Sequence, residues 1–149
     1  MIPGNPWQSY RQVATKTAPP GTLVLMLYDG ALRFLNLALG GFDLEDPLEY
    51  NMAINNNLLR AQDIINELNL SLNMTGGGEF AHTMRSLYTY FDSRLQESNA
   101  YKKPEGIREV VLRLTVLRDA WSEMLAKQGQ TSDLPPQEGQ PFPSLEARG

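Results

Sequence analysis

The fold of this chain is decided by residues 23–35, which have the sequence LVLMLYDGALRFL. The apolar residues here recur at the three- and four-residue spacing of an α-helix. No part of the chain shows the sustained alternation that is typical of strands. Proline and glycine divide the remainder into stretches of helical length. The sequence therefore predicts four main helices, at residues 20–39, 47–73, 78–100 and 104–128, and a short helical turn at 6–14.

The residues that flank these stretches suit helix ends. Asp46 before Pro47 predicts an N-cap followed by proline at the first helical position. Gly40 and Gly129 are expected to cap the C-termini of their helices, and the glycines at 76–78 mark a break between two helices. Short connections between long helices favour antiparallel neighbours. The predicted fold is therefore all-α, an antiparallel up-and-down four-helix bundle.

Composition limits the compartment and the partners. The chain has 149 residues, of which 42% are hydrophobic, which suits one domain with a single core. Its net charge of −4 argues against nucleic acid and against anionic membrane surfaces as partners. The longest unbroken apolar run, residues 23–28, is far shorter than the ~20 residues of a membrane span. Residues 1–6 lack the pattern of a signal peptide, and the absence of cysteine fits a cytoplasmic protein.

Candidate catalytic and metal-binding patterns are weak. Glu79 and His82 have the Glu-x-x-His spacing of di-iron bundles, but the chain has one histidine, so a surface histidine is the preferred interpretation. The glycines at 76–78 lack the Lys-Ser/Thr of a phosphate loop. Carboxylates such as Asp43 and Glu45 leave acid–base chemistry open. We expect no catalytic residue, no cofactor and no metal, and we do not expect an enzyme.

Three of the predicted helices carry more apolar residues than a bundle core needs. In the first helix the polar residues Asp29, Arg33 and Asn36 leave roughly 260° of the surface apolar or small. The second helix has a core stripe and, nearly opposite, a second stripe interleaved with amides. The second stripe consists of Leu48, Met52, Leu59 and Leu70. In the last helix Leu112 and Val116 fall outside the core stripe. These residues either pack inside the domain or form a groove for a helical ligand, and the wheel leaves both open.

Residues 23–35 resemble the signature of the FliS family, the flagellin-specific export chaperones. Three other segments resemble family segments in the same order along the chain. They are NPWQSY at 5–10, RAQDIINEL at 60–68 and LRDAW at 117–121. The resemblance thus extends from about residue 5 to residue 125. The chain departs from the usual pattern at Pro19, where a serine commonly caps the first helix, at Trp7, where tyrosine is usual, and in its longer tail.

The resemblance implies an antiparallel bundle in the bacterial cytoplasm. It implies binding of the C-terminal helical region of flagellin, which prevents premature polymerisation, and delivery to the flagellar type III export gate. Three regions are expected. Residues 1–19 form an aromatic segment, with Trp7 and Tyr10, that caps the groove. Residues 20–128 form the bundle, and residues 129–149 form a disordered tail rich in proline and glycine.

The wheel and the resemblance together suggest contact residues for flagellin. The expected apolar anchors are Met26, Leu32, Met52, Leu59, Leu112 and Val116, and the expected polar contacts are Asn55, Gln62 and Asn66. The choice between the two edges of the first helix is arbitrary at this stage. The alternative is a helical interaction or regulatory module that binds another flagellar protein or forms a homodimer by exchange of its N-terminal segment.

Overall fold

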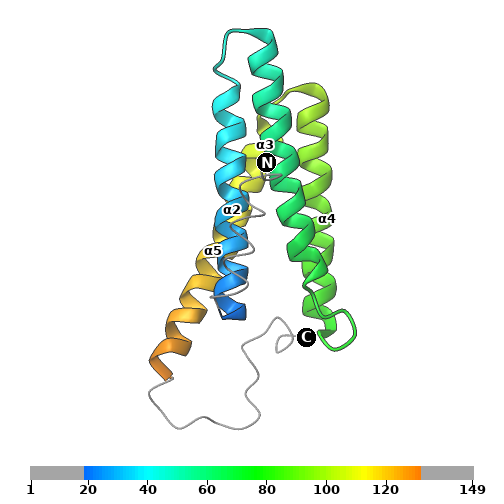
Figure 1. The fold of residues 1–149 in the computed structure, drawn as a ribbon. Coiled ribbons are helices and arrows are strands. Elements are labelled where there is room, and N and C mark those ends of the chain that lie inside the picture. The colour runs from blue at the N-terminus through cyan, green and yellow to red at the C-terminus, as the bar shows by residue number, and fades with distance from the viewer. Residues whose placement is uncertain (1–18, 132–149) are drawn as a thin grey trace, which may run out of the picture.

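The computed structural model of the chain describes residues 19–131. Within this range the structure consists of four helices and no strand, which confirms the predicted fold class (Figure 1). The helices are α2 (Pro20–Gly41), α3 (Pro47–Leu70), α4 (Gly78–Tyr101) and α5 (Glu105–Thr131). The predictions for the turn at 6–14, for Trp7 and Tyr10, and for the tail beyond residue 131 lie outside the described residues.

The helices form an antiparallel bundle in which each one packs against its neighbours in the chain. The packed pairs are α2–α3, α3–α4, α4–α5 and α5–α2, so α3 and α5 occupy opposite corners. Helices α2 and α4 run in one direction and α3 and α5 in the other (Figure 1). The pair α2–α5 diverges from the pair α3–α4 toward the end of the bundle where α2 begins.

The ends of the helices confirm some of the expected caps and correct others. Asp46 caps α3, because its Oδ2 accepts a hydrogen bond from the backbone N–H of Glu49 at 2.9 Å, and Pro47 follows it. Pro19 precedes α2 and supplies no side-chain cap. The predicted glycine caps are wrong. Helix α2 continues through Gly40 to Gly41, and α5 continues through Gly129 to Thr131. Neither Gly40 nor Gly129 has the positive φ that ends a helix in the left-handed region.

Helix α3 ends three residues before the predicted end at Asn73. Ser71 is its C-cap, and the Ser71 hydroxyl donates to the carbonyl oxygen of Leu68 at 2.6 Å. A serine that bonds to its own backbone in this way competes with continuation of the helix. The Asn73 side chain then accepts a hydrogen bond from the N–H of Gly76 at 2.9 Å. The glycines correctly predicted a break before α4. The structure shows that side-chain hydrogen bonds hold this turn.

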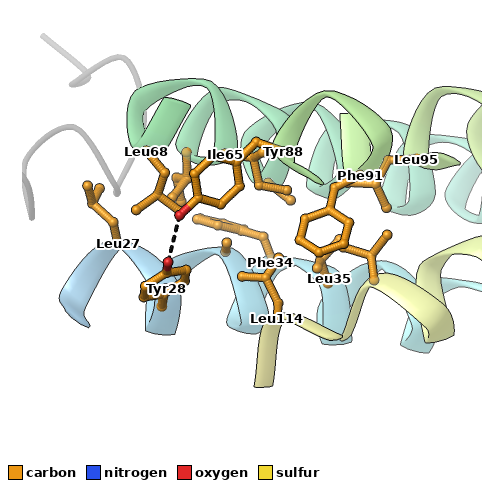
Figure 2. Packing of buried hydrophobic residues seen from close by; sticks show 14 of the residues in the cluster. Leu27, Tyr28, Phe34, Leu35, Ile65, Leu68, Tyr88, Phe91, Leu95 and Leu114 are labelled. Carbon is orange, nitrogen blue, oxygen red and sulfur yellow. Dashed lines mark hydrogen bonds between the residues drawn. The ribbon is translucent and has the colours of Figure 1, made fainter. Parts of the chain in front are cut away.

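The core lies between the four helices and contains one polar contact between aromatic rings. Figure 2 shows the hydroxyl of Tyr28 on α2 facing that of Tyr88 on α4, with an oxygen–oxygen distance of 2.6 Å. Both rings are buried among Leu35, Ile65, Phe91 and other apolar side chains. Because α2 and α4 occupy opposite corners, this hydrogen bond crosses the centre of the bundle.

A second buried hydrogen bond fixes α5 against the start of α2. The indole N–H of Trp121 donates to the carbonyl oxygen of Gly21 at 2.8 Å. A buried indole N–H usually finds an acceptor, because leaving it unpaired costs free energy. Trp121 therefore determines where the first turn of α2 packs along α5.

Helix α2 is long and apolar enough to cross a membrane by length and composition, although its unbroken apolar run is short. Residues Gly21–Gly41 have a mean hydropathy of 1.4. A buried helix of a soluble bundle meets the same criterion. In this structure α2 contributes a continuous buried face to the core, which consists of Leu27, Tyr28, Ala31, Phe34, Leu35 and Ala38. Packing of the bundle thus accounts for part of the apolar character of α2, and Leu37 remains exposed.

Gly77 is expected to be intolerant of a side chain. A Cβ at Gly77 would overlap the backbone oxygen of Asn73 and lie 2.6 Å from the Cβ of Ala81. A Cβ at Gly76 would meet only the movable side-chain amide of Asn73, at 3.0 Å. We expect Gly77→Ala to lower the free energy of unfolding by about 2 kcal/mol and Gly76→Ala by less than about 0.5 kcal/mol, measured by urea denaturation. Equal losses in the two variants would contradict the overlap.

The buried tyrosine pair predicts a loss of stability at alkaline pH. Burial raises the pKa of Tyr28, although the hydrogen bond from Tyr88 opposes the rise, and burial raises the pKa of Tyr88 still further. The unfolded chain releases these protons near the ordinary tyrosine pKa of about 10. The unfolded state therefore binds fewer protons than the folded state above this pH, and the free energy of unfolding falls as pH rises further.

The double variant Tyr28→Phe/Tyr88→Phe removes both hydroxyls and leaves neither one unpaired. We expect its free energy of unfolding to decrease less between about pH 9 and pH 11 than that of the wild type. Urea denaturation across this range measures the difference, since all other tyrosines are common to both proteins. Parallel curves would show that the pair has no raised pKa.

Candidate functional site

The second apolar stripe of α3, for which the helical wheel left both internal packing and exposure open, is exposed. Leu48 and Leu70 are 67% and 68% exposed, and Met52 and Leu59 are about half exposed. Leu58, which adjoins Leu59 in sequence, is completely buried. The stripe thus lies on the side of α3 away from the core, where Leu48 and Leu70 are mostly open to water.

Helix α5 presents a smaller apolar surface. Leu112 and Val116 are 69% and 63% exposed, while Leu114 between them is fully buried. One turn of helix separates Leu112 from Val116, so the two side chains are neighbours on one face. Both predicted anchors on α5 are thus accessible to a partner.

The two edges of α2 differ. Leu25, Leu32 and Leu39 form the edge toward α5, and all three are half-buried against the core. Arg118 of α5 contacts α2 on this side, where its Nε donates to Oδ1 of Asp29 at 2.7 Å. Interior packing therefore accounts for this edge. On the other edge Met26 is half-buried and Leu37 is exposed.

The predicted anchors do not form one compact site. Met52 and Leu59 lie on the outer face of α3, and Leu112 and Val116 lie on the outer face of α5. Because α3 and α5 occupy opposite corners, these two faces point in opposite directions. A short segment can contact either face, and a partner that contacts both must pass around the bundle.

Polar side chains link α3 to α4 at a regular interval. Nδ2 of Asn99 donates to Oδ1 of Asn55 at 2.9 Å, Nε2 of Gln62 donates to Oδ1 of Asp92 at 3.0 Å, and Nε of Arg85 donates to Oδ1 of Asn69 at 3.2 Å. Within each helix these residues are seven positions apart, so each set lies on one face. Two of the predicted polar contacts, Asn55 and Gln62, are therefore engaged within the bundle, whereas Asn66 is exposed.

Between these links lies a pocket with a volume of about 320 Å³. Its lining residues come from α3 and α4 and are Gln62, Asp63, Ile65, Asn66, Asn69, Tyr88, Thr89 and Asp92. Ile65 and Tyr88 belong to the buried core, so the floor of the pocket is apolar. Its rim consists of amides, a hydroxyl and two carboxylates. Of these rim residues, the sequence pointed only to Gln62 and Asn66 as contact residues.

Charged side chains on the α4–α5 seam form a separate cluster around Glu109. Its carboxylate accepts hydrogen bonds from the hydroxyl of Tyr90 at 2.7 Å, from Nε of Arg94 at 2.9 Å and from Nε of Arg113 at 3.0 Å. The bond from Tyr90, aided by those from the two arginines, lowers the pKa of Glu109. Both carboxylate oxygens of Glu109 accept hydrogen bonds in these contacts, so the cluster is suited to joining α4 and α5.

The described structure gives little support to a metal site. Residues 19–131 contain no group of three or more histidine, aspartate or glutamate side chains placed to hold a metal ion. His82 is exposed, as its position opposite the core stripe indicated. Exposed aromatic residues that the sequence analysis did not select are Tyr90 and Tyr101. Both fall outside the core stripe of their helix, which is the signal that could have identified them.

A helical bundle with a closed core and exposed apolar stripes on opposite corners is typical of proteins that bind other proteins. Comparison with known proteins specifies the class further. The family model described as "Flagellar protein FliS" matches residues 3–128, so this chain belongs to the FliS family.

Characterised relatives agree with this assignment. The chain is 37% identical over 121 residues to the flagellar secretion chaperone FliS of Bacillus subtilis, covering 81% of this chain and 86% of the relative. It is 31% identical over 125 residues to the protein of the same name from Salmonella typhimurium, covering 80% of this chain and 90% of the relative. A third such chaperone, from Campylobacter jejuni, is 30% identical over 121 residues, covering 79% and 89%.

A pair of adjacent leucines tests the division of α3 into buried and exposed stripes. We expect Leu59→Asp to lower the free energy of unfolding by about 1 kcal/mol, because about half of its side chain is already exposed to water. Leu58→Asp places a carboxylate in the core and is expected to abolish folding. Circular dichroism with urea denaturation measures both. Similar losses in the two variants would contradict the exposure of Leu59.

Proposed function

We propose that this chain is a cytoplasmic export chaperone that binds the C-terminal helical region of flagellin. The observation that carries the proposal is membership of a family whose relatives are named flagellar secretion chaperones. The exposed stripe on α3 supports it, because a partner with an apolar helical face can bury these side chains. By this proposal the protein acts through binding and not as an enzyme.

Capture of a client by the α3 stripe needs no chemical energy. A client segment that is unordered alone loses conformational entropy when it binds, and burial of apolar surface offsets that loss. Each large apolar side chain removed from water contributes about 1.5–3 kcal/mol. Client release then depends on competition or hand-over at the flagellar export apparatus. Capture by this route keeps flagellin from polymerising before export.

The α3 stripe is the better candidate for the main contact. It includes four apolar side chains over most of the length of α3, whereas α5 contributes only Leu112 and Val116. Asn66 lies within the α3 stripe and can offer hydrogen bonds to polar groups of the client. The predicted cover by residues 1–19, with Trp7 and Tyr10, remains part of the proposal. So does delivery to the export gate, while homodimer formation by exchange of the N-terminal segment belongs to the alternative function.

Titration of the full chain with the C-terminal helical region of its own flagellin tests the proposal. We expect binding at micromolar concentration or tighter by calorimetry. We expect Leu59→Asp to weaken it at least about tenfold, since 1.4 kcal/mol corresponds to a factor of ten and a buried leucine contributes more.

The matched control is Leu112→Asp, which makes the same change on the opposite corner of the bundle. Loss of affinity in Leu59→Asp alone would place the main contact on α3. An absence of binding by the wild type at micromolar concentrations would overturn the proposed function. Unchanged affinity in Leu59→Asp would remove the α3 stripe from it.

A further inference from the structure

The pocket between α3 and α4 is rich in hydrogen-bond acceptors. The carboxylates of Asp63 and Asp92 and the amide oxygens of Asn66 and Asn69 all belong to its lining. No lysine or arginine lines it, and within residues 19–131 no cation forms an ion pair with Asp63. A pocket with two negative charges and no internal cation favours a positively charged, donor-rich group.

The rim of the pocket already binds a group of this kind from the chain itself. Arg85 lies beside the pocket, and its Nε donates to Oδ1 of Asn69 at 3.2 Å while its Nη2 lies 3.4 Å from the Asn69 carbonyl oxygen. Asn69 thus presents two oxygens that suit the fork of a guanidinium. Arg85 is exposed and uses only this edge, so the contacts with Asp63, Asn66 and Thr89 are left to another group.

We propose that this pocket receives an arginine side chain of the client that the α3 stripe binds, and so selects the register of the client. The inference rests on the proposed function, because the same client must cover α3. The guanidinium would donate to the carboxylates of Asp63 and Asp92 and to the amide oxygen of Asn66. Its aliphatic stem would lie over Ile65 and the ring of Tyr88, the apolar floor of the pocket.

The position of the pocket along α3 sets the pattern that a client must carry. Leu59 and Leu70 are exposed on either side of it, about 16 Å apart along the helix at 1.5 Å per residue. On the wheel both lie within roughly 40° of Asn66. A helical client that fits this surface has one arginine between two apolar residues about 11 positions apart. Apolar contacts alone would let the client bind along α3 in several registers. Contact of its arginine with the pocket allows only one of them.

Asp63→Asn tests the pocket, because Asp63 forms no ion pair within the described structure and the change keeps its shape. We expect this variant to bind the C-terminal region of flagellin about fivefold more weakly than the wild type at low salt. The ratio should shrink as salt is added, because the lost interaction is between charges. Asp43→Asn is the matched control. It makes the same change of charge in the α2–α3 connection, and we expect less than a twofold effect.

Replacement of each arginine of the flagellin fragment by glutamine identifies the partner residue. One replacement should weaken binding to the wild type and have no further effect on Asp63→Asn, as expected for two residues that act together. Equal affinities of Asp63→Asn, Asp43→Asn and the wild type would overturn the pocket and leave the proposed function intact. An absence of binding by the wild type would instead overturn the proposed function.

A probe that is independent of flagellin keeps the pocket testable in either case. Nuclear magnetic resonance can follow the side-chain amides of Asn66 and Asn69 during titration with N-acetyl-arginine methylamide. We expect their signals to shift with this probe and to shift far less with the citrulline analogue, which has the same shape and no charge. Identical shifts with the two probes would contradict recognition of a guanidinium.

Discussion

Burial of the broad apolar face of α2 is the constraint on which the rest of the structure depends. This helix packs directly against α3 and α5, and its Tyr28 reaches across the core to Tyr88 of α4. It therefore contacts all three other helices, as α4 does through the same tyrosine pair. All four helices fill the interior with their core stripes, so a second stripe on the opposite side of α3 or α5 cannot also face the core. Leu59 and Leu112 are left outside, where they can act on a partner.

The contacts in the core differ in kind from those in the outer seam between α3 and α4. The core is almost entirely apolar, and its polar groups, Tyr28, Tyr88 and Trp121, are paired by hydrogen bonds. The outer seam between α3 and α4 is instead joined by amide and carboxylate side chains. Amides such as Gln62 hold a seam together while leaving acceptors open to water, so the same residues that join the helices shape a pocket. An apolar seam would have closed it.

The sequence predicted the fold and identified the residues outside the core stripes, since both depend on the angle of a residue around its own helix. Leu59 and Ile65 point in very different directions on one wheel, and the structure buries only the second. What the wheel cannot show depends on neighbours in space. Leu32 is packed against the core under α5, and Gln62 bonds to Asp92, thirty residues later. Gly40 and Gly129 show that a glycine ends a helix only when the chain must turn there.

The opposite placement of the two exposed stripes limits how any single client can bind. A segment that covers the α3 stripe is directed away from Leu112 and Val116, so contact with both faces requires a longer chain that passes over α2 or α4. Several modest contacts linked along one chain bind tightly together although each is weak alone, and losing one contact raises the rate at which the next is lost.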